Sequence, residues 1–448
     1  MFKKFTNASV KLVQRFLPDP FLFAVILTLV VFLLGVFSTG QSPIDMVNHW
    51  SGGFWNLLAF SMQMALVLVT GHTLAQAPII KRGLRNLASV PKSPGSAIFA
   101  VTLVALIASW INWGFGLVIG ALYAKELAKK VKGVDYRLLI ASGYSGFVIW
   151  HAGFSASIPL TLATATANLE EMTRGAVTEP IPTSETIFAL FTVVPVLILI
   201  ATIPFINKAM HPSAEDAVVV DPKLLEDDIE PEIPVNQTPA EKMENSPVLS
   251  IAIGLMGFTF VVQHFIQNGF DLNLNVVNFI FLFTGIILHG TPRRFLNAVT
   301  TAVKGAGGII IQFPFYAGIM GMMTGASAEG LSLAQQMSTF FVSVSTEVTF
   351  PFFAFLSAGI VNFFVPSGGG QWAVQAPIMM PAGAELGVDA AKTAMAVAWG
   401  DGWTNMIQPF WALPALGIAG LGAKDIMGYC LINLIYVGVV VSLFLVIL

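Results

Sequence analysis

The segment GSAIFAVTLVALIASWINWGFGLVIGALYA, residues 95–124, contains no charged side chain and has basic residues on both sides. The flanking clusters are Lys81, Arg82, Arg85 and Lys92 before it, and Lys125, Lys129, Lys130, Lys132 and Arg137 after it. Short loops rich in Lys and Arg stay in the cytoplasm, so both ends of the segment are expected at the cytoplasmic face. Each arm has about 15 residues, which at about 1.5 Å per residue is too short to cross the hydrocarbon core. The segment therefore predicts a re-entrant hairpin with its tip near Asn112.

The composition places the rest of the chain in a membrane as well. Of 448 residues, 55% are hydrophobic and 10% are charged, whereas soluble domains have about 25% charged residues. No basic stripe for nucleic acid is present, and the single cysteine, Cys430, excludes an intrachain disulfide or a thiolate metal cluster. The basic start is not followed by a small-residue cleavage site, so residues 1–18 are expected to be a cytoplasmic segment rather than a signal peptide.

The positive-inside rule gives a direction to each apolar stretch. All basic residues except Arg174 and Lys392 fall into six clusters that can lie together on the cytoplasmic side. The stretch 348–385 then lies between two outer loops and is expected to be a second hairpin, entered from outside. The expected membrane segments are 19–38, 55–77, the hairpin 95–124, the broken helix 137–168, 186–207, 247–267, 276–290, 305–326, the hairpin 348–385, the broken helix 390–421 and 425–448.

The order span, span, hairpin, broken span, span therefore occurs twice with opposite orientation. The first repeat is 19–207 and the second is 276–448, separated by an acidic cytoplasmic linker at 208–246 and an extra span at 247–275. Inverted repeats with discontinuous helices are typical of secondary transporters. The expected fold is an all-α polytopic protein of the inner (plasma) membrane, with its N-terminus in the cytoplasm and its C-terminus on the periplasmic or extracellular side.

Hairpin tips and helix breaks cannot expose their backbone to lipid, so they are expected to face protein or a water-filled cavity. Helix N-termini that meet there attract anions, which favours a small carboxylate as the substrate. Asp401 is the only acid well inside an expected span, and its cost in a membrane indicates a role in holding a coupling ion or proton. His151 in the first break is a candidate for carboxylate binding or proton transfer. The alternatives are a structural Asp401 that is protonated or hydrogen-bonded, and a neutral His151 satisfied by backbone carbonyls.

Polar and small residues at the tips and breaks are the candidates for contact with the substrate. A tip asparagine can cap a helix end or bind a ligand, and glycines permit close approach of the backbone. Four tryptophans at the same places, Trp113, Trp150, Trp403 and Trp411, would wall an aliphatic tail. The candidate substrate-binding residues are Ser109, Asn112, Trp113, Gly114, His151, Ser155, Ser157, Asn362, Ser367, Gly368, Gly369, Gly370, Gln371, Thr404 and Asn405. The candidates for holding the coupling Na⁺ or proton are Asp401, His151, Asn112 and Asn362.

Four segments resemble the short-chain fatty acid transporter (AtoE-like) family. They are SWINWGFG at 109–116, GYSGFVIWHAGFS at 143–155, NFFVPSGGGQW at 362–372 and WGDGWTN at 399–405. The likeness covers nearly the whole chain, the acidic linker included. This family is grouped with the ion transporter superfamily, which implies a scaffold domain and a mobile transport domain that move by an elevator mechanism, usually in a homodimer.

The sodium-coupled members of that superfamily have a Ser-Asn-Thr motif at each hairpin tip. Asn112 and Asn362 match the asparagine by placement, but their neighbours Trp113 and Phe363 are aromatic, which suits a short aliphatic monocarboxylate. The resemblance implies transport of anions such as acetoacetate or butyrate, coupled to H⁺ or Na⁺ and without a cofactor. The expected partners are the substrate, membrane lipid and a second copy of the chain, and not nucleic acid.

Three alternatives remain open at this point. One is a transporter for another organic anion, such as a dicarboxylate, although few Lys or Arg residues lie within the expected spans to balance a second charge. Another is an intramembrane enzyme, for which the sequence offers no Gly-x-Ser-x-Gly or His-Glu-x-x-His motif. The third is a channel.

Overall fold

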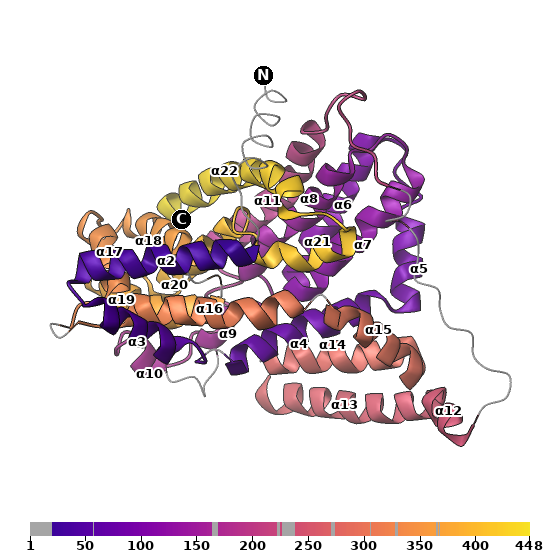
Figure 1. Cartoon of the computed structure of the whole chain (residues 1–448), viewed down its shortest axis with the longest axis horizontal. Coiled ribbons are helices and arrows are strands. Elements are labelled where there is room, and N and C mark those ends of the chain that lie inside the picture. The colour runs from indigo at the N-terminus through magenta and orange to yellow at the C-terminus, as the bar shows by residue number, and fades with distance from the viewer. Residues whose placement is uncertain are drawn as a thin grey trace.

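The computed structural model describes residues 20–56, 58–163, 169–221, 225, 238–269, 274–304, 306–327, 330–363, 366 and 368–448. Every regular element within these ranges is a helix, which confirms the all-α class. The expected N-terminal segment 1–18 and much of the linker 208–246 lie outside the described residues. Figure 1 shows most of the long helices running along one common direction.

The long helices are apolar around their whole circumference, which is typical of segments buried in protein or lipid. Among the described residues, four helices are long and apolar enough to cross a membrane: α6, α11, α13 and α22. Their bounds are α6 (Pro94–Ile111), α11 (Leu190–Ala209), α13 (Pro247–Asn268) and α22 (Ala423–Ile447). Apolar helices also occupy the other expected spans: α2 (Pro20–Thr39), α4 (Leu58–Ala75), α14 (Leu274–His289) and α16 (Gly307–Thr324).

The first expected hairpin consists of α6 and α7 (Trp113–Lys130), which meet at the single residue Asn112. Asn112 has an extended backbone, and its side chain accepts a hydrogen bond from the Phe115 N–H at 2.9 Å, so it caps α7. The arms touch at the tip, because a Cβ on Gly116 would lie 2.3 Å from the Ser109 Oγ. Each arm has 18 residues rather than about 15; α6 is long and apolar enough to cross a membrane, whereas the last turns of α7 are charged. Entry from one face stays a prediction that depends on the flanking basic residues.

The first broken helix comprises α8 (Tyr136–Ser145), the 3-10 helix η1 (Gly146–Ala152) and α9 (Ser157–Leu162). Asp135 begins α8 by accepting a hydrogen bond from the Leu138 N–H at 2.8 Å. A Cβ on Gly146 would lie 2.4 Å from the backbone of Ala105 in α6. This absence of a side chain allows η1 to pack directly on the first hairpin.

The second hairpin and second broken helix have the same order. The hairpin arms are α18 (Phe350–Asn362) and α19 (Gly368–Glu385), and Gln371 of α19 donates to the Ala358 carbonyl of α18 at 2.8 Å. Next come α20 (Ala390–Thr404), an interruption at 405–409, the short helix η3 (Phe410–Ala412) and α21 (Leu413–Ala419). Gly400 allows α18 and α20 to cross closely, since its Cβ would lie 2.3 Å from the Phe355 carbonyl oxygen.

Two pairs of the remaining helices run in the same direction. Phe21 at the start of α2 contacts Phe315 of α16, and Gln41 beyond its end donates to the Gly325 carbonyl at 3.1 Å, so α2 and α16 run the same way. The ends of α4 and α14 also lie together, where His289 bonds the Thr73 carbonyl at 2.8 Å. Figure 1 shows α13 and α14 at one edge of the molecule.

Several helices lie where the sequence predicted loops. The expected outer loop 39–54 holds α3 (Pro43–Gly53), which packs on α16 through Gly53 and Gly321. Two amphipathic helices, α5 (Pro78–Leu87) and α15 (Pro292–Lys304), follow α4 and α14. The expected loop 327–346 contains α17 (Leu333–Ser343). Short helices α10 (Leu169–Met172) and α12 (Pro239–Glu244) complete the described chain. These helices are short or amphipathic, so a search for long apolar runs does not find them.

Candidate functional site

The two broken helices meet at a buried imidazole–carboxylate pair. His151 in η1 and Asp401 in α20 lie 250 residues apart in sequence, and the imidazole Nδ1 is 2.7 Å from the carboxylate Oδ2. The exposed fraction of each residue is 1% or less. The Ile158 N–H at the start of α9 donates to Nε2 at 3.1 Å, so the ring proton lies on Nδ1 and is donated to Asp401. His151 is therefore neutral and oriented from both sides.

The second oxygen of this carboxylate is free. Asp401 Oδ1 is buried and has no hydrogen-bond partner among the described residues. A buried carboxylate oxygen without a donor is costly, because it has lost water and gained nothing in exchange. This oxygen is thus the place in the pair that a proton or a cation can occupy.

The tip of the second hairpin lies directly against the pair. A Cβ built on Gly368, the first residue of α19, would lie 2.7 Å from the His151 Cε1 and 3.0 Å from the Ser157 Cβ. Only glycine lets the start of α19 approach the imidazole this closely. Gly402 of α20 also lies beside the imidazole, but a Cβ there would lie 3.5 Å from the His151 Cβ, an ordinary van der Waals distance, so this position does not require glycine.

Asn362 joins the second hairpin to the second break. Its amide nitrogen donates to Thr404 Oγ1 at 2.9 Å and to Asn405 Oδ1 at 3.0 Å. Thr404 in turn donates to the Gly359 carbonyl of α18 at 3.0 Å. All three polar side chains are buried, and Asn362 Oδ1 and Asn405 Nδ2 have no partner among the described residues.

The first hairpin tip is bonded to the first break. The backbone N–H of Trp113 donates to Ser155 Oγ at 3.0 Å, and the indole N–H of Trp110 donates to the Ala152 carbonyl at 3.0 Å. The Phe154 N–H returns a bond to the Trp110 carbonyl at 2.8 Å. Both tips and both breaks therefore gather around residues 150–158.

Three of the four expected tryptophans form one aromatic wall. The ring centroid of Trp113 lies 4.9 Å from that of Trp411 and 6.1 Å from that of Trp150. Trp150 stacks on His151 with ring centroids 4.1 Å apart. The expectation for Trp403 was wrong: its indole donates to the Leu434 carbonyl of α22 and packs on Phe355. Two residues along a helix turn a side chain by about 200°, so Trp403 leaves the face that holds Asp401.

The other predicted residues have varied surroundings. Ser109 is buried, and its hydroxyl has no partner among the described residues. Gly114 packs against Gly71 of α4, where a Cβ would lie 3.0 Å from the Gly114 carbonyl carbon. Gln371 bonds Ala358 and Gln375 within the second hairpin. Gly369 and Gly370 follow Gly368 in the first turn of α19, and Ser367 lies outside the described residues.

Sequence reasoning missed three aromatic residues at the site. Trp110 ties the first tip to the first break, as described above. Tyr144 of α8 donates to the Asn405 carbonyl at 2.6 Å, and Gln408 donates to the Tyr316 hydroxyl of α16 at 3.1 Å. In a chain rich in aromatic residues, no sequence signal separates these three from those that only fill space.

A family model described as "Short chain fatty acid transporter" matches residues 1–448. The chain belongs to this family. In Escherichia coli (strain K12), a short-chain fatty acid transporter family relative named "Putative short-chain fatty acid transporter" is 45% identical over 442 residues, 98% of each chain. A relative of the same name in Haemophilus influenzae is 44% identical over 441 residues, 97% of each chain.

The fold also has a counterpart among solved structures. The crystal structure of the Alcanivorax borkumensis YdaH transporter matches with a TM-score of 0.52 and 17% identity, over 96% of this chain and 97% of that one. At this identity the likeness concerns the fold alone. Membership of the short-chain fatty acid transporter family, together with the apolar helices, makes this chain a multi-pass membrane transporter of a small molecule and not an enzyme.

Proposed function

We propose that the chain takes up short-chain fatty acid anions such as acetoacetate or butyrate, by symport with H⁺ or Na⁺. The observation that carries this proposal is the meeting of Gly368, His151 and Asp401, which joins a hairpin tip to both broken helices. A site made from such discontinuities is where alternating-access transporters bind substrate. Family membership supports the substrate class.

The carboxylate of the substrate would bind to neutral donors. Four buried donor groups near the tips and breaks have no partner among the described residues: Ser109 Oγ, Trp113 Nε1, Trp150 Nε1 and Asn405 Nδ2. The N-termini of α7 and α19 add the positive ends of two helix dipoles. Neutral donors and dipoles suit one negative charge, whereas a dicarboxylate would call for a buried Arg or Lys.

The aliphatic part of the substrate would lie against the aromatic wall of Trp113, Trp150 and Trp411. These side chains are at most 3% exposed, so a tail that reaches them leaves water almost completely. Each methylene so buried contributes about 0.8 kcal/mol. The wall would therefore favour butyrate over acetate.

The coupling ion would bind at Asp401. Its free Oδ1 can take a proton, or it can coordinate Na⁺ together with the free Asn362 Oδ1. Either cation would offset the charge that the incoming carboxylate brings into a site that already holds one. His151 would keep the other carboxylate oxygen in a fixed position.

The hairpins and broken helices would move as one transport domain against a scaffold of α2, α3, α4, α13, α14 and α16. Gln408 and Tyr316 form one hydrogen bond across that boundary. The scaffolds of two copies would form a homodimer. The chain would lie in the inner membrane, with its N-terminus in the cytoplasm and its C-terminus outside. Basic residues on the loops support this orientation.

Proteoliposomes that contain the purified protein test the substrate and the coupling ion together. Uptake of labelled butyrate is measured under a proton gradient alone and under a sodium gradient alone, with acetoacetate and succinate as competitors. The proposal expects accumulation under one gradient and competition by acetoacetate. Competition by succinate alone, or no accumulation under either gradient, would refute it.

A further inference from the structure

The second break is held to the scaffold by a hydrogen bond of fixed direction. Pro409 has no N–H and disfavours a helical backbone at Gln408. The Gln408 side chain folds back on the turn that follows, where its Oε1 accepts a hydrogen bond from the Phe410 N–H at 2.8 Å. A backbone N–H can only donate, so the amide nitrogen of Gln408 faces the other way and donates to the Tyr316 hydroxyl at 3.1 Å.

Tyr316 lies on a helix that the scaffold fixes from two sides. Its neighbour Phe315 packs edge-to-face on Phe21 of α2, with ring centroids 5.3 Å apart. A Cβ on Gly318 would lie 2.6 Å from the Trp50 ring of α3, so α3 and α16 are in close contact. Helix α16 therefore presents the Tyr316 hydroxyl to the break from a fixed position.

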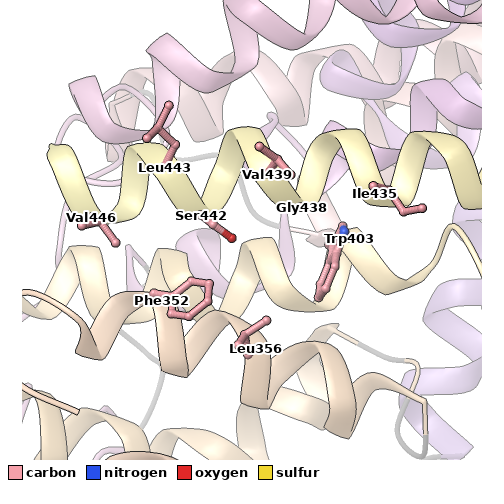
Figure 2. A pocket seen from close by; sticks show the side chains of 9 residues that line it. All are labelled: Phe352, Leu356, Trp403, Ile435, Gly438, Val439, Ser442, Leu443 and Val446. Atoms are coloured by element: carbon pink, nitrogen blue, oxygen red, sulfur yellow. The ribbon is translucent and has the colours of Figure 1, made fainter.

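The residues just before the break are attached to other helices. The Trp403 indole of α20 donates to the Leu434 carbonyl of α22 at 2.6 Å, and Figure 2 shows its ring between α18 and α22. A Cβ on Gly359 of α18, or on Gly438 of α22, would each lie 2.9 Å from this ring. The end of α20 is thus fixed to the second hairpin, whereas Gln408 is fixed to the scaffold. The interruption that follows α20 lies between these two attachments.

We infer that Tyr316 is a positioning residue that acts through Gln408 and sets the rate at which the transport domain leaves the described arrangement. This inference rests on the proposed movement of the hairpins and broken helices against the scaffold. That movement separates Gln408 from α16, and a hydrogen bond of 3.1 Å weakens steeply once its atoms move apart. Both side chains are buried, so each loses its partner before water replaces it. The bond therefore stabilises the resting arrangement more than the barrier, and it slows translocation without adding to substrate affinity.

Tyr316→Phe isolates this bond, because it removes the hydroxyl and keeps the ring that packs on Phe410. Exchange of labelled butyrate without a gradient is measured in proteoliposomes, and the butyrate Kd is measured by isothermal titration. We expect the maximal exchange rate to rise about fivefold, the Boltzmann factor of one neutral hydrogen bond, while Kd stays within about twofold. A purely structural role would not separate rate from affinity in this way. An unchanged exchange rate, or a higher Kd without a faster rate, would overturn the inference.

Tyr136→Phe is the matched control. Tyr136 is as buried as Tyr316, and its hydroxyl donates to the Ala419 carbonyl at the same 3.1 Å, but this bond joins the two broken helices to each other. Its loss should leave the exchange rate unaltered, because the two ends move together. Gln408→Met breaks the Tyr316 bond from the other side, and Tyr316→Phe should then add nothing to the rate. An equal rate change in the control, or additive effects of Tyr316→Phe and Gln408→Met, would contradict the inference.

Hydrogen–deuterium exchange of the full-length protein tests the same contact without a substrate. Gln408 Oε1 protects the Phe410 amide only while the Gln408 side chain is held in place. The Phe410 amide should therefore exchange severalfold faster in Tyr316→Phe and at the unaltered rate in Tyr136→Phe. Failure of butyrate uptake in the unaltered protein would refute the proposed function and leave this result standing, whereas unchanged exchange at Phe410 would refute the positioning role of Tyr316.

Discussion

The imidazole of His151 donates a hydrogen bond to the carboxylate of Asp401 at 2.7 Å, and the pair links the two broken helices of the chain. His151 lies in η1 and Asp401 lies in α20. One carboxylate oxygen is fixed by the imidazole and the other is free. This asymmetry gives a single position for a coupling cation.

The energetic link between the two residues can be measured with a double-mutant cycle. His151→Ala and Asp401→Ala should each cost about 1–3 kcal/mol of stability, because each leaves a buried polar partner unpaired. The double variant should cost less than the sum, by about 0.5–3 kcal/mol. Thermal unfolding in detergent provides the free energies, and the pair His151→Ala with Asp389→Ala is the additive control. Additivity in the first pair would contradict a direct bond.

Asn362 is expected to contribute to substrate binding and not only to folding. Asn362→Ala removes the amide that bonds Thr404 and Asn405, so the Kd for butyrate should rise about tenfold, the effect of losing about 1.4 kcal/mol. Asn433→Ala is a matched control, because Asn433 is a buried amide that bonds Asn207 of α11 and not a residue of a hairpin tip or of α20. Isothermal titration gives both Kd values. An equal rise in the two variants would show a general loss of stability.

The two ends of the first hairpin are expected on the same side of the membrane. Lys92→Cys and Lys130→Cys should both react with an impermeant maleimide from the cytoplasm, whereas Glu385→Cys should react only from outside. Each of these positions is exposed, and the native Cys430 is fully buried, which keeps the background low. Reaction of positions 92 and 130 from opposite sides would mean that the segment crosses the bilayer.

Helix α3 should lose stability in acid because of its N-terminal capping box. Hydrogen bonds from the Ser42 hydroxyl and then from its backbone N–H lower the pKa of Asp45 below its ordinary value of 3.8. A lowered pKa stabilises the folded state above about pH 4, and the contribution disappears as the pH falls through the folded pKa. Asp45→Ala should therefore lower Tm at pH 7 but not at the acid end of the titration. Ser51→Ala, on the same helix, should have an effect that does not vary with pH.

Much of the fold follows from the sequence because its decisive features are local. Asn112 interrupts an apolar run, so the first hairpin tip could be located from composition, whereas α20 continues through the Gly and polar residues 400–404 and is interrupted only at 405–409. The length of the hairpin arms could not be predicted from composition, because α7 continues beyond the apolar run into the charged residues from Lys125 to Lys130. Helix α3 could not be predicted by a search for apolar spans either, because it is short and half polar.

The site was predictable residue by residue but not as a set of contacts. Asp401 and His151 are recognisable because charges and imidazoles are rare in apolar segments. Their pairing depends on how α20 crosses η1, which tertiary packing decides. The same packing turns Trp403 away from the site and brings Tyr316 of α16 to Gln408. No local pattern contains that information.

The most direct test of the coupling role is the accumulation of labelled butyrate by Asp401→Asn in proteoliposomes, under the gradient that drives the unaltered protein. Asparagine keeps the size of the side chain but cannot take up the cation, so accumulation should fall by roughly tenfold or more, as loss of a charged partner worth about 1.5–3 kcal/mol implies. Exchange of butyrate without a gradient should persist, and Asp389→Asn should accumulate normally. Gradient-driven accumulation by Asp401→Asn at the unaltered level would contradict the proposed mechanism.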